Sequence, residues 1–554
     1  MNLQTAFGRK IVYLVILVAM LVPLFLLGQP SGGGNDPGGR LTEMRREFNI
    51  AESDLGEISP ASETMKLASL GLRGVAATLL WNKAHEFKIR HEWDRLRAAL
   101  NNIALLQPHF DKVWEFQSWN LAYNVSVEFD DYRQRYAMVR EGTEFLTRGV
   151  NQNRHAPRLV WYTGWFYGQK IGMADEKKQF RRLFADDDVL HEHLLDEGIA
   201  VDSPDARGPL GKPDNWLVGR LWLNRGYDLV DSGVKIRRQT PLNFFETGSK
   251  WRIKHAEAIE REGILDERAQ NAWQLAHEDW LAFGNRSIPT TSPFTIKLDQ
   301  LDELNRQIDE RLEQFREMTG EVYESEKQRL IANLDQDQRA LLDRPLSELD
   351  AGQRHDREIL RSQTQPDVQL VARQADPSVR MRAILLAGEI QDLAMRAAKT
   401  DSYRNQINYP YWRTLSAAEQ EERTVRARRL VYEAEQANAE AEIDRAIELY
   451  EEAFAIWAEI FEDYPILVID DTGEDLYESI QRYRVAIDSE TLPDDFPLKG
   501  LVDLMDETGR LQMDAVEEIL SSPDGRVDPS RFRRGESGGQ KEGMIDVPDF
   551  RAGN

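Results

Sequence analysis

Apolar residues in the body of this chain recur at intervals of three and four, and this spacing constrains the fold more than any other feature. Such spacing aligns apolar side chains along one face of an α-helix, whereas the strict alternation that builds β-strands is hard to find here. Small residues stand at regular positions among the large ones, and small side chains let helices cross closely. The sequence therefore predicts a mostly α-helical protein.

The stretch 77–170 fits a helix–turn–helix repeat with a period of about 34 residues, in which Pro108 closes the first unit. In this register Ala84 takes the small position of the first helix, and the second helix is lined by Leu96, Leu100 and Ile103. The second unit contains an insertion at 125–136, and its inward positions are Trp114, Ser118, Leu121, Gly142, Leu146 and Gly149. A third unit offers Val160, Gly164 and Tyr167.

A fourth match lies far downstream, where Ala453, Trp457 and Pro465 occupy the small, aromatic and closing positions of a second helix. Together these units resemble the tetratricopeptide repeat. The resemblance implies an α-solenoid-like stack of helical hairpins, an architecture that offers an extended surface to other proteins. Generic helical packing is the alternative, because any amphipathic hairpin that ends in proline fits the same pattern.

An uncharged apolar run occupies residues 11–28. At about 1.5 Å per residue this run would span roughly 27 Å as a helix, enough for the apolar core of a bilayer. Arg9 and Lys10 precede it and no basic residue follows before Arg40, so the positive-inside rule predicts a cytoplasmic segment 1–10 and an exported body. The prediction is a single-pass protein of the bacterial inner membrane with a periplasmic body. A cleaved signal peptide is the alternative.

A heptad pattern runs through 297–345, and its positions are Leu301, Leu304, Ile308, Arg311, Phe315, Met318 and Val322. This pattern is typical of a long coiled-coil helix with one polar interruption, at Arg311. The helix either folds back on the helical segment 379–400 of its own chain or joins two copies into a homo-oligomer.

The expected organisation follows from these patterns and from breaks in composition. A Gly-rich linker at 29–60 joins the anchor to the body, and the polar tail at 521–554 is expected to be disordered. Within the body, Pro and Gly breaks indicate helices near 215–232 and 252–283. The predicted divisions are 61–199 for the repeat-like domain, 200–295 for an irregular helical domain, 296–400 for the coiled-coil helices and 401–520 for a C-terminal helical domain with one more hairpin.

Composition excludes several kinds of chemistry. The chain has 554 residues and no cysteine, which rules out disulfides, thiolate metal sites and a cysteine nucleophile. Lys and Arg number 70 and Asp and Glu number 95, and the net charge of 70 − 95 = −25 argues against nucleic-acid binding. No cofactor, no metal and no catalytic residue is predicted. A metal-dependent enzyme with a site at 186–197, around Asp188 and His191, is the alternative.

A basic run at 423–429 lies beside two glutamates. Such runs are typical of a solvent-exposed helical face with ion pairs one turn apart. The prediction is a pair between Glu422 and Arg426, with the other arginines in solvent.

Aromatic side chains are dense at 114–136 and 161–167. Most of them fit inward helical positions and are expected in the core. The others could form a surface for a protein partner, because Trp and Tyr supply much of the binding energy at many interfaces. The candidate partner-binding residues are Trp119, Tyr123, Tyr132 and Trp165.

A further resemblance rests on four phrases, which are LASLGLRGVAATLLWNKAHEFK at 67–88, LLQPHFDKVWEFQSWNLAYNVSVEFDDYR at 105–133, FGNRSIPT at 283–290 and NYPYWR at 408–413. With these phrases the chain resembles a family of large, single-span membrane proteins of planctomycete bacteria. Some members carry a label that refers to an iron-responsive element, which is an RNA structure and implies no mechanism. The resemblance implies a role in the cell envelope and assigns no catalytic residue.

These inferences together predict a membrane-anchored periplasmic scaffold of helical repeats that binds protein partners in the envelope. Two alternatives stay open. One is the metal-dependent envelope enzyme, and the other is a structural spacer that self-associates through 297–345.

Overall fold

A computed structural model describes residues 73–345, 349, 351–469, 471–489, 491–493 and 495–508. The chain divides into two compact units, which are called unit 1 (Met1–Thr240) and unit 2 (Pro241–Asn554). Among the described residues no helix is both long and apolar enough to cross a membrane. Three predicted segments lie outside the described residues: the anchor at 11–28, the linker at 29–60 and the tail at 521–554.

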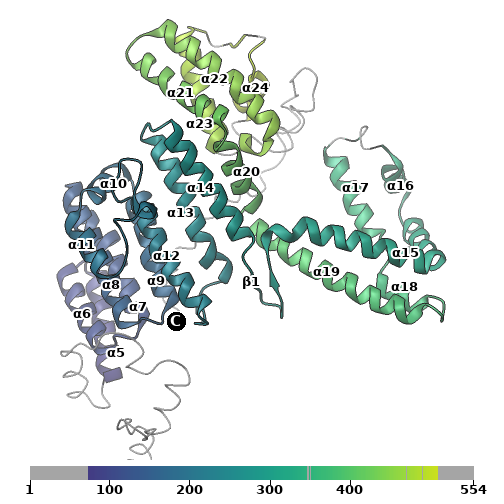
Figure 1. Cartoon of the computed structure of the whole chain (residues 1–554), viewed down its shortest axis with the longest axis horizontal. Helices are drawn as coiled ribbons and strands as arrows, with labels where there is room; N and C mark the ends of the chain where they lie inside the picture. The colour runs from purple at the N-terminus through teal and green to yellow at the C-terminus, as the bar shows by residue number, and fades with distance from the viewer. Residues whose placement is uncertain are drawn as a thin grey trace, which may run out of the picture. The chain divides into compact units, whose positions relative to one another are not determined.

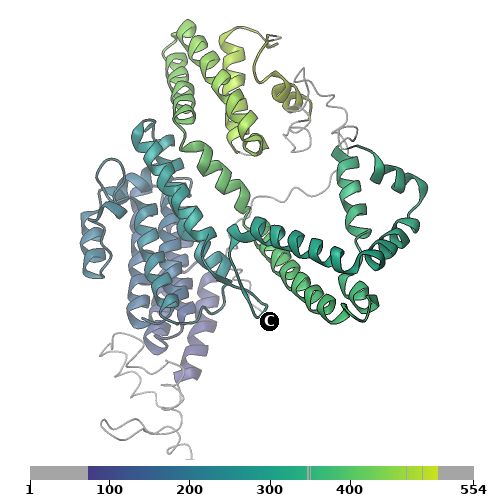
Figure 2. The same ribbon diagram turned by 45° about the vertical axis from the view of Figure 1, so that its right-hand side comes forward.

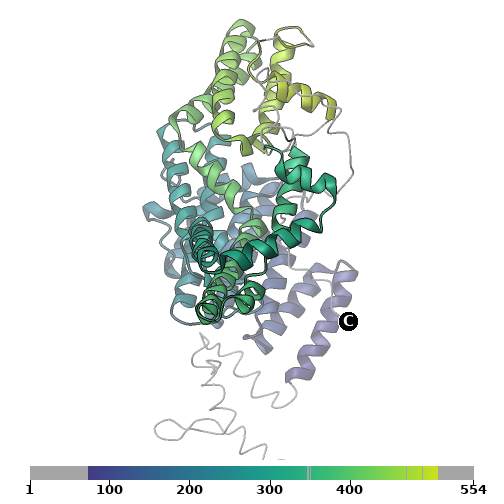
Figure 3. The same cartoon turned by 90° about the vertical axis from the view of Figure 1, so that its right-hand side faces the viewer.

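Unit 1 consists of helical hairpins, as the spacing of apolar residues predicted (Figure 1). The described helices, numbered as in Figure 1, are α5 (Arg73–Ile89), α6 (Trp93–Leu106), α7 (Asp111–Trp119), α8 (Tyr132–Gln152), α9 (Pro157–Phe166), α10 (Lys177–Ala185), α11 (Asp188–Asp196) and α12 (Asn215–Asp231). Helix α5 packs against α6, α7 against α8, and α9 against α12. Figure 3 views the purple and blue helices of this unit from another side.

Two helices of unit 1 continue past their α-helical part as a π-helical turn. These turns are Asn120–Val125 after α7 and Tyr167–Ile171 after α9. Each inserts extra backbone into a helix, which shifts the direction of the side chains that follow. A short 3-10 turn, Ser126–Glu128, then leads towards α8. The first part of the predicted insertion at 125–136 therefore lies between α7 and α8, and its last five residues form the start of α8.

Glycines stand where the helices of unit 1 approach one another most closely, as the repeat pattern predicted. A Cβ atom added to Gly149 would lie 2.7 Å from the ring of Trp114, and one on Gly164 would lie 2.5 Å from the backbone oxygen of Gly219. Neither distance is tolerable, so only glycine permits these crossings. The predicted inward positions of the first unit are also buried, namely Ala84, Leu96, Leu100 and Ile103.

Unit 2 begins with a second kind of hairpin, α13 (Pro241–Arg261) against α14 (Glu267–Gly284). A two-stranded antiparallel ribbon follows, β1 (Ile288–Pro289) with β2 (Thr295–Ile296), in which Ile288 pairs with Ile296. The remaining helices are α15 (Leu301–Ala332), α16 (Gln336–Asp343), α17 (Ala351–Gln363), α18 (Val368–Gln374), α19 (Arg380–Gln406), α20 (Tyr409–Glu419), α21 (Glu422–Ala439), α22 (Ile443–Asp463), α23 (Asp471–Ala486) and α24 (Lys499–Thr508).

The predicted coiled-coil helix is α15, and it pairs with α19 of the same chain (Figure 2). All seven predicted heptad positions of α15 are buried or half-buried. Arg311, the polar interruption, forms an ion pair with Glu389 of α19, with 3.3 Å between Nε and Oε2. Phe315 and Tyr323 share a core with residues of α18 and α19. Of the two predicted pairings, the structure contains the one in which the helix folds back on segment 379–400 of its own chain.

The C-terminal hairpin, α21 with α22, matches the fourth predicted repeat unit. Ala453 and Trp457 are buried on α22, and Pro465 begins a 3-10 turn after the helix ends. The small residues that precede α22 in sequence lie on α21, where Ala434 and Ala437 face the core.

The divisions between domains differ from the predicted ones. The predicted boundary at residue 200 separates α9 from α12, yet these two helices pack against each other within unit 1. The segment predicted as one helix, 252–283, contains the end of α13 and most of α14 with a turn between them. At that turn Gly263 adopts a φ of 85°, a left-handed conformation that ends the first helix.

Candidate partner-binding site

The four predicted anchor residues have different surroundings. Trp165 is only 1% exposed and lies in the core of unit 1, so it cannot present its ring to a partner. Its assignment as an anchor was wrong, because the aromatic spacing of α9 places it inward together with the buried rings of Trp161 and Tyr162. Trp119, Tyr123 and Tyr132 are half-buried.

Trp119 and Tyr123 form a stacked pair. Their ring centroids are 3.8 Å apart and the ring planes differ by 13°. Trp119 is the last α-helical residue of α7, and Tyr123 lies in the π-helical turn that follows. Tyr123 also makes a T-shaped contact with Phe166 of α9, with centroids 6.1 Å apart. Such ring contacts add about 0.5–1.5 kcal/mol to the energy of burial. The contact with Phe166 therefore helps to fix the position of the stacked pair.

A buried lysine lies against the same pair. Lys170 stands in the π-helical turn after α9, is 7% exposed, and places its Nζ 4.3 Å from the centroid of Tyr123. Burial lowers the pKa of the Lys170 ammonium and raises the pKa of the Tyr123 hydroxyl. A cation on a ring in a dry environment contributes about 2 kcal/mol. Trp119, Tyr123 and Lys170 are called the aromatic–lysine stack.

Tyr132 opens α8, where its ring lies 4.9 Å from the guanidinium carbon of Arg133. This contact is local to the first turn of the helix. The structure therefore brings together two of the four predicted residues, Trp119 and Tyr123, and adds Lys170 to them.

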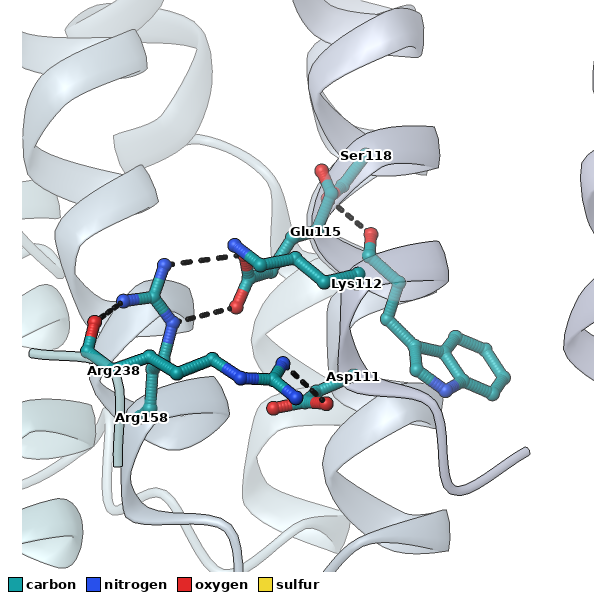
Figure 4. Close-up of polar contacts among 7 residues, drawn as sticks. Asp111, Lys112, Glu115, Ser118, Arg158 and Arg238 are labelled. Atoms are coloured by element: carbon teal, nitrogen blue, oxygen red, sulfur yellow. Dashed lines mark hydrogen bonds and ion pairs between the residues drawn. The ribbon is translucent and has the colours of Figure 1, made fainter. Parts of the chain in front are cut away.

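A buried network of charges fixes α7 against α9 (Figure 4). The side chain of Glu115 is fully buried, and Arg158 of α9 donates to both of its oxygens, Nε to Oε1 at 3.0 Å and Nη2 to Oε2 at 3.3 Å. Lys112 donates to Oε2 from one turn earlier, at 2.7 Å. Because both carboxylate oxygens accept from cations, Glu115 acts as a clasp between two helices.

The same network holds the segment between α12 and α13. Arg158 donates through Nη1 to the backbone oxygen of Arg238 at 2.6 Å. Arg238, which has a φ of 60°, in turn places its guanidinium 3.5 Å from Asp111 at the start of α7. The charges therefore connect α7, α9 and the end of unit 1.

One hydroxyl lies close to both the network and the stack. Burial raises the pKa of Tyr162, and the charges of Glu115 and Tyr123 raise it further. Its Oη has no hydrogen-bond partner among the described residues. A buried hydroxyl without a partner costs about 1–3 kcal/mol, so this position adds no stability through hydrogen bonding.

Sequence reasoning missed Glu115, Arg158 and Lys170. A signal for two of them exists, because Glu115 stands inside the apolar phrase VWEFQSW and Lys170 inside WFYGQKIG. A charged residue at an inward position of an aromatic helix requires a buried partner. The sequence does not say which partner, since Arg158 is 43 positions from Glu115.

The predicted exposed arginine face on α21 is wrong for Arg428. Its guanidinium donates to Glu419, with Nε 2.7 Å from Oε2, and Nε lies 3.6 Å from Glu260 of α13. Glu419 is fully buried, and burial raises the pKa of Glu260. The predicted pair of Glu422 with Arg426 is also replaced, because Arg426 reaches Glu452 of α22.

The alternative metal site at 186–197 does not assemble in the structure. His191 is buried in a T-shaped contact with Phe184, at 5.2 Å between ring centroids, and burial lowers the pKa of His191. The side chain of His193 is 60% exposed and lies 3.9 Å from Glu144. Across the described part of the chain, no group of three His, Asp or Glu residues is placed to hold a metal ion.

Comparison with protein-family models, with curated proteins and with solved structures finds no match to this chain. What the site can do therefore follows from its own geometry. The site has two stacked, half-buried rings, Trp119 and Tyr123, at the end of α7, and the buried ammonium of Lys170 lies against Tyr123. That arrangement suits binding through flat aromatic contact.

Proposed function

We propose that this chain is a membrane-anchored scaffold of the bacterial envelope that binds a protein partner through the aromatic–lysine stack of unit 1. The observation that carries the proposal is the stacking of Trp119 on Tyr123 at a half-exposed position, with Lys170 buried beneath. Trp and Tyr are the residue types that most often supply binding energy at protein interfaces.

The stack is suited to binding because it is already ordered. Its rings are held by Phe166 and Lys170, and its helix is held by the clasp of Glu115 with Arg158. A side chain that is immobile before binding loses less conformational entropy when a partner arrives, a saving of about 0.5–1.5 kcal/mol for each residue.

The membrane part of the proposal is supported by the sequence. The uncharged run at 11–28 follows Arg9 and Lys10, which is the charge arrangement of an anchor with an exported body.

The experiment uses the tagged, full-length chain in its native membranes. Crosslinking and affinity capture identify the partner, and capture is then compared for the wild type, Trp119→Ala and Tyr123→Ala. Each of these changes should reduce capture at least about tenfold, since a hot-spot residue contributes roughly 2 kcal/mol or more. Trp119→Phe, which keeps a ring on Tyr123, should retain most of the capture.

Trp93→Ala is the matched control, because Trp93 is also a half-buried tryptophan of unit 1 and its ring contacts only the local His91 among the contacts described. Circular dichroism confirms that each variant keeps its helices. The proposal is wrong if folded Trp119→Ala and Tyr123→Ala variants capture the partner as well as the wild type does. It is also wrong if Trp93→Ala weakens capture equally.

A further inference from the structure

Helix α19 has two faces of opposite character. Its inner face carries Ala383, Ala387 and Ile390, which are buried in the core shared with α15 and α18. Its outer face carries three large apolar side chains in solvent, with exposed fractions of 70% for Met381, 64% for Leu385 and 53% for Met395. Apolar residues are often exposed singly, but three along one line of one helix are typical of a contact surface.

Gly388 lies in the middle of this outer face. A Cβ atom added there would meet no other atom within 4 Å, so the backbone of α19 is open to approach at this point. Met381 lies seven residues before Gly388 and Met395 seven residues after it. Seven residues are two turns, which keeps all three positions on one line about 21 Å long. Met381, Leu385, Gly388 and Met395 are called the outer stripe.

The outer stripe is self-complementary. Two copies of α19 that run in opposite directions and cross at Gly388 place Met381 of each copy against Met395 of the other. A two-fold symmetric contact has this property, since residue i meets residue j and residue j meets residue i. Glycine at the crossing point lets the two helix axes come close, as small residues do at other tight helix crossings.

Charge also favours the antiparallel arrangement. Arg382 is exposed and forms no ion pair with any described residue. In the antiparallel pairing it lies about 3 Å along the axis from Asp392 of the other copy, within reach of its side chain. In a parallel pairing the two copies of Arg382 would lie side by side and repel. Arg380 and Arg396 also come opposite each other, but Arg380 donates to Ala375 and Arg396 to Asp392 of their own chain.

From this pattern we infer that the outer stripe of α19 joins two copies of this chain in an antiparallel, two-fold contact. A second copy is the occupant that fits, because Met381 and Met395 are placed symmetrically about Gly388. In this orientation Arg382 also comes near Asp392 of the other copy, whose Oδ2 accepts from Arg396 of its own chain while Oδ1 stays open to a second donor. The contact covers about four turns of each helix, less than the roughly 1,200 Å² of a standard interface. The dimer is therefore concentration-dependent. It is independent of the proposed partner site, which lies in unit 1.

The absence of cysteine from the chain makes the inference directly testable. Gly388→Cys puts a single thiol at the crossing point, and a disulfide forms only when the two Cβ atoms come within about 4.5 Å. The matched control is Gly320→Cys on α15, since Gly320 is equally open to solvent. Membranes that contain each full-length variant are oxidised with copper phenanthroline. A disulfide-linked dimer, at twice 63.8 kDa, should form at least tenfold faster with Gly388→Cys than with Gly320→Cys.

A second pair of variants tests the direction of the helices. A mixture of Met381→Cys and Met395→Cys chains should crosslink faster than either variant alone. Leu385→Arg, placed in the Gly388→Cys background, should suppress the disulfide. Equal rates for Gly388→Cys and Gly320→Cys would overturn the inference, as would faster crosslinking of Met381→Cys with itself, which indicates a parallel pair. Crosslinking of Gly388→Cys to a different protein in place of itself would also overturn it.

Discussion

Replacement of Arg158 by methionine should destabilise unit 1 by about 3 kcal/mol. The side chain of Glu115 is fully buried and that of Arg158 is 12% exposed, so the pair is shielded from water. Removing one partner of a buried ion pair typically costs about 3–5 kcal/mol, because the other charge is left uncompensated. Lys112 still contacts Glu115 in the variant, which places the expected cost at the low end of this range.

The opposite replacement and the double variant separate the pair from its surroundings. Glu115→Gln leaves Arg158 with its bond to the backbone oxygen of Arg238 and with an amide oxygen as a second acceptor, so this change should cost less than Arg158→Met. The double variant should be more stable than the sum of the two single changes predicts. The expected coupling is about 1–3 kcal/mol, as for residues in one hydrogen-bonded network.

Hydrogen exchange of the full-length chain measures the effect locally. Amides of α7 and α9 in the Arg158→Met variant should exchange through openings that are about 3 kcal/mol less costly than in the wild type. The matched control is Arg95→Met, which removes an exposed pair with Glu92 at 2.8 Å. Exposed pairs contribute about 0–1 kcal/mol. If Arg158→Met costs no more than Arg95→Met, the network does not hold α7 against α9.

Two further predictions concern helix crossings and pH. Gly164→Ala should destabilise the chain by about 1–3 kcal/mol, because the added atom meets the backbone of the facing helix. Gly320→Ala, which has open space, should stabilise it by up to about 1 kcal/mol in the same thermal unfolding experiment. Burial raises the pKa of Glu260 above its ordinary 4.5, with Glu419 adding to the shift and Arg428 opposing it. The folded chain then keeps a proton that the unfolded chain releases, so stability should fall as pH rises above 4.5. Glu260→Gln should flatten this dependence in urea unfolding, and identical pH profiles for variant and wild type would contradict the assignment.

Spacing in the sequence predicted the parts of the fold that depend on one helix and its immediate neighbour. The small residues Gly149 and Gly164 mark real crossings, and the heptad on α15 marks the face that meets α19. These predictions succeed because a helix places every third or fourth residue on one face, whatever the rest of the chain does.

Contacts between distant segments were not predictable in the same way. The spacing of α9 gives its buried face but does not say that α12, about fifty residues later, covers it. The sequence of the basic run on α21 predicts an exposed face, yet Arg428 forms ion pairs with Glu419 of α20 and Glu260 of α13. Trp119 and Trp165 both stand in stretches dense in aromatic residues, and the same role was predicted for both, although Trp165 is a core ring and Trp119 is half-buried.

Site-specific photocrosslinking tests the proposed partner site most directly. A photoreactive phenylalanine derivative replaces Trp119 in the full-length chain, and the same replacement at Trp93 serves as the control. On illumination of native membranes, position 119 should crosslink to one discrete protein, and position 93 should not. Crosslinks to the same proteins from both positions, or none from position 119 in a folded chain, would contradict the assignment of the aromatic–lysine stack as the binding site.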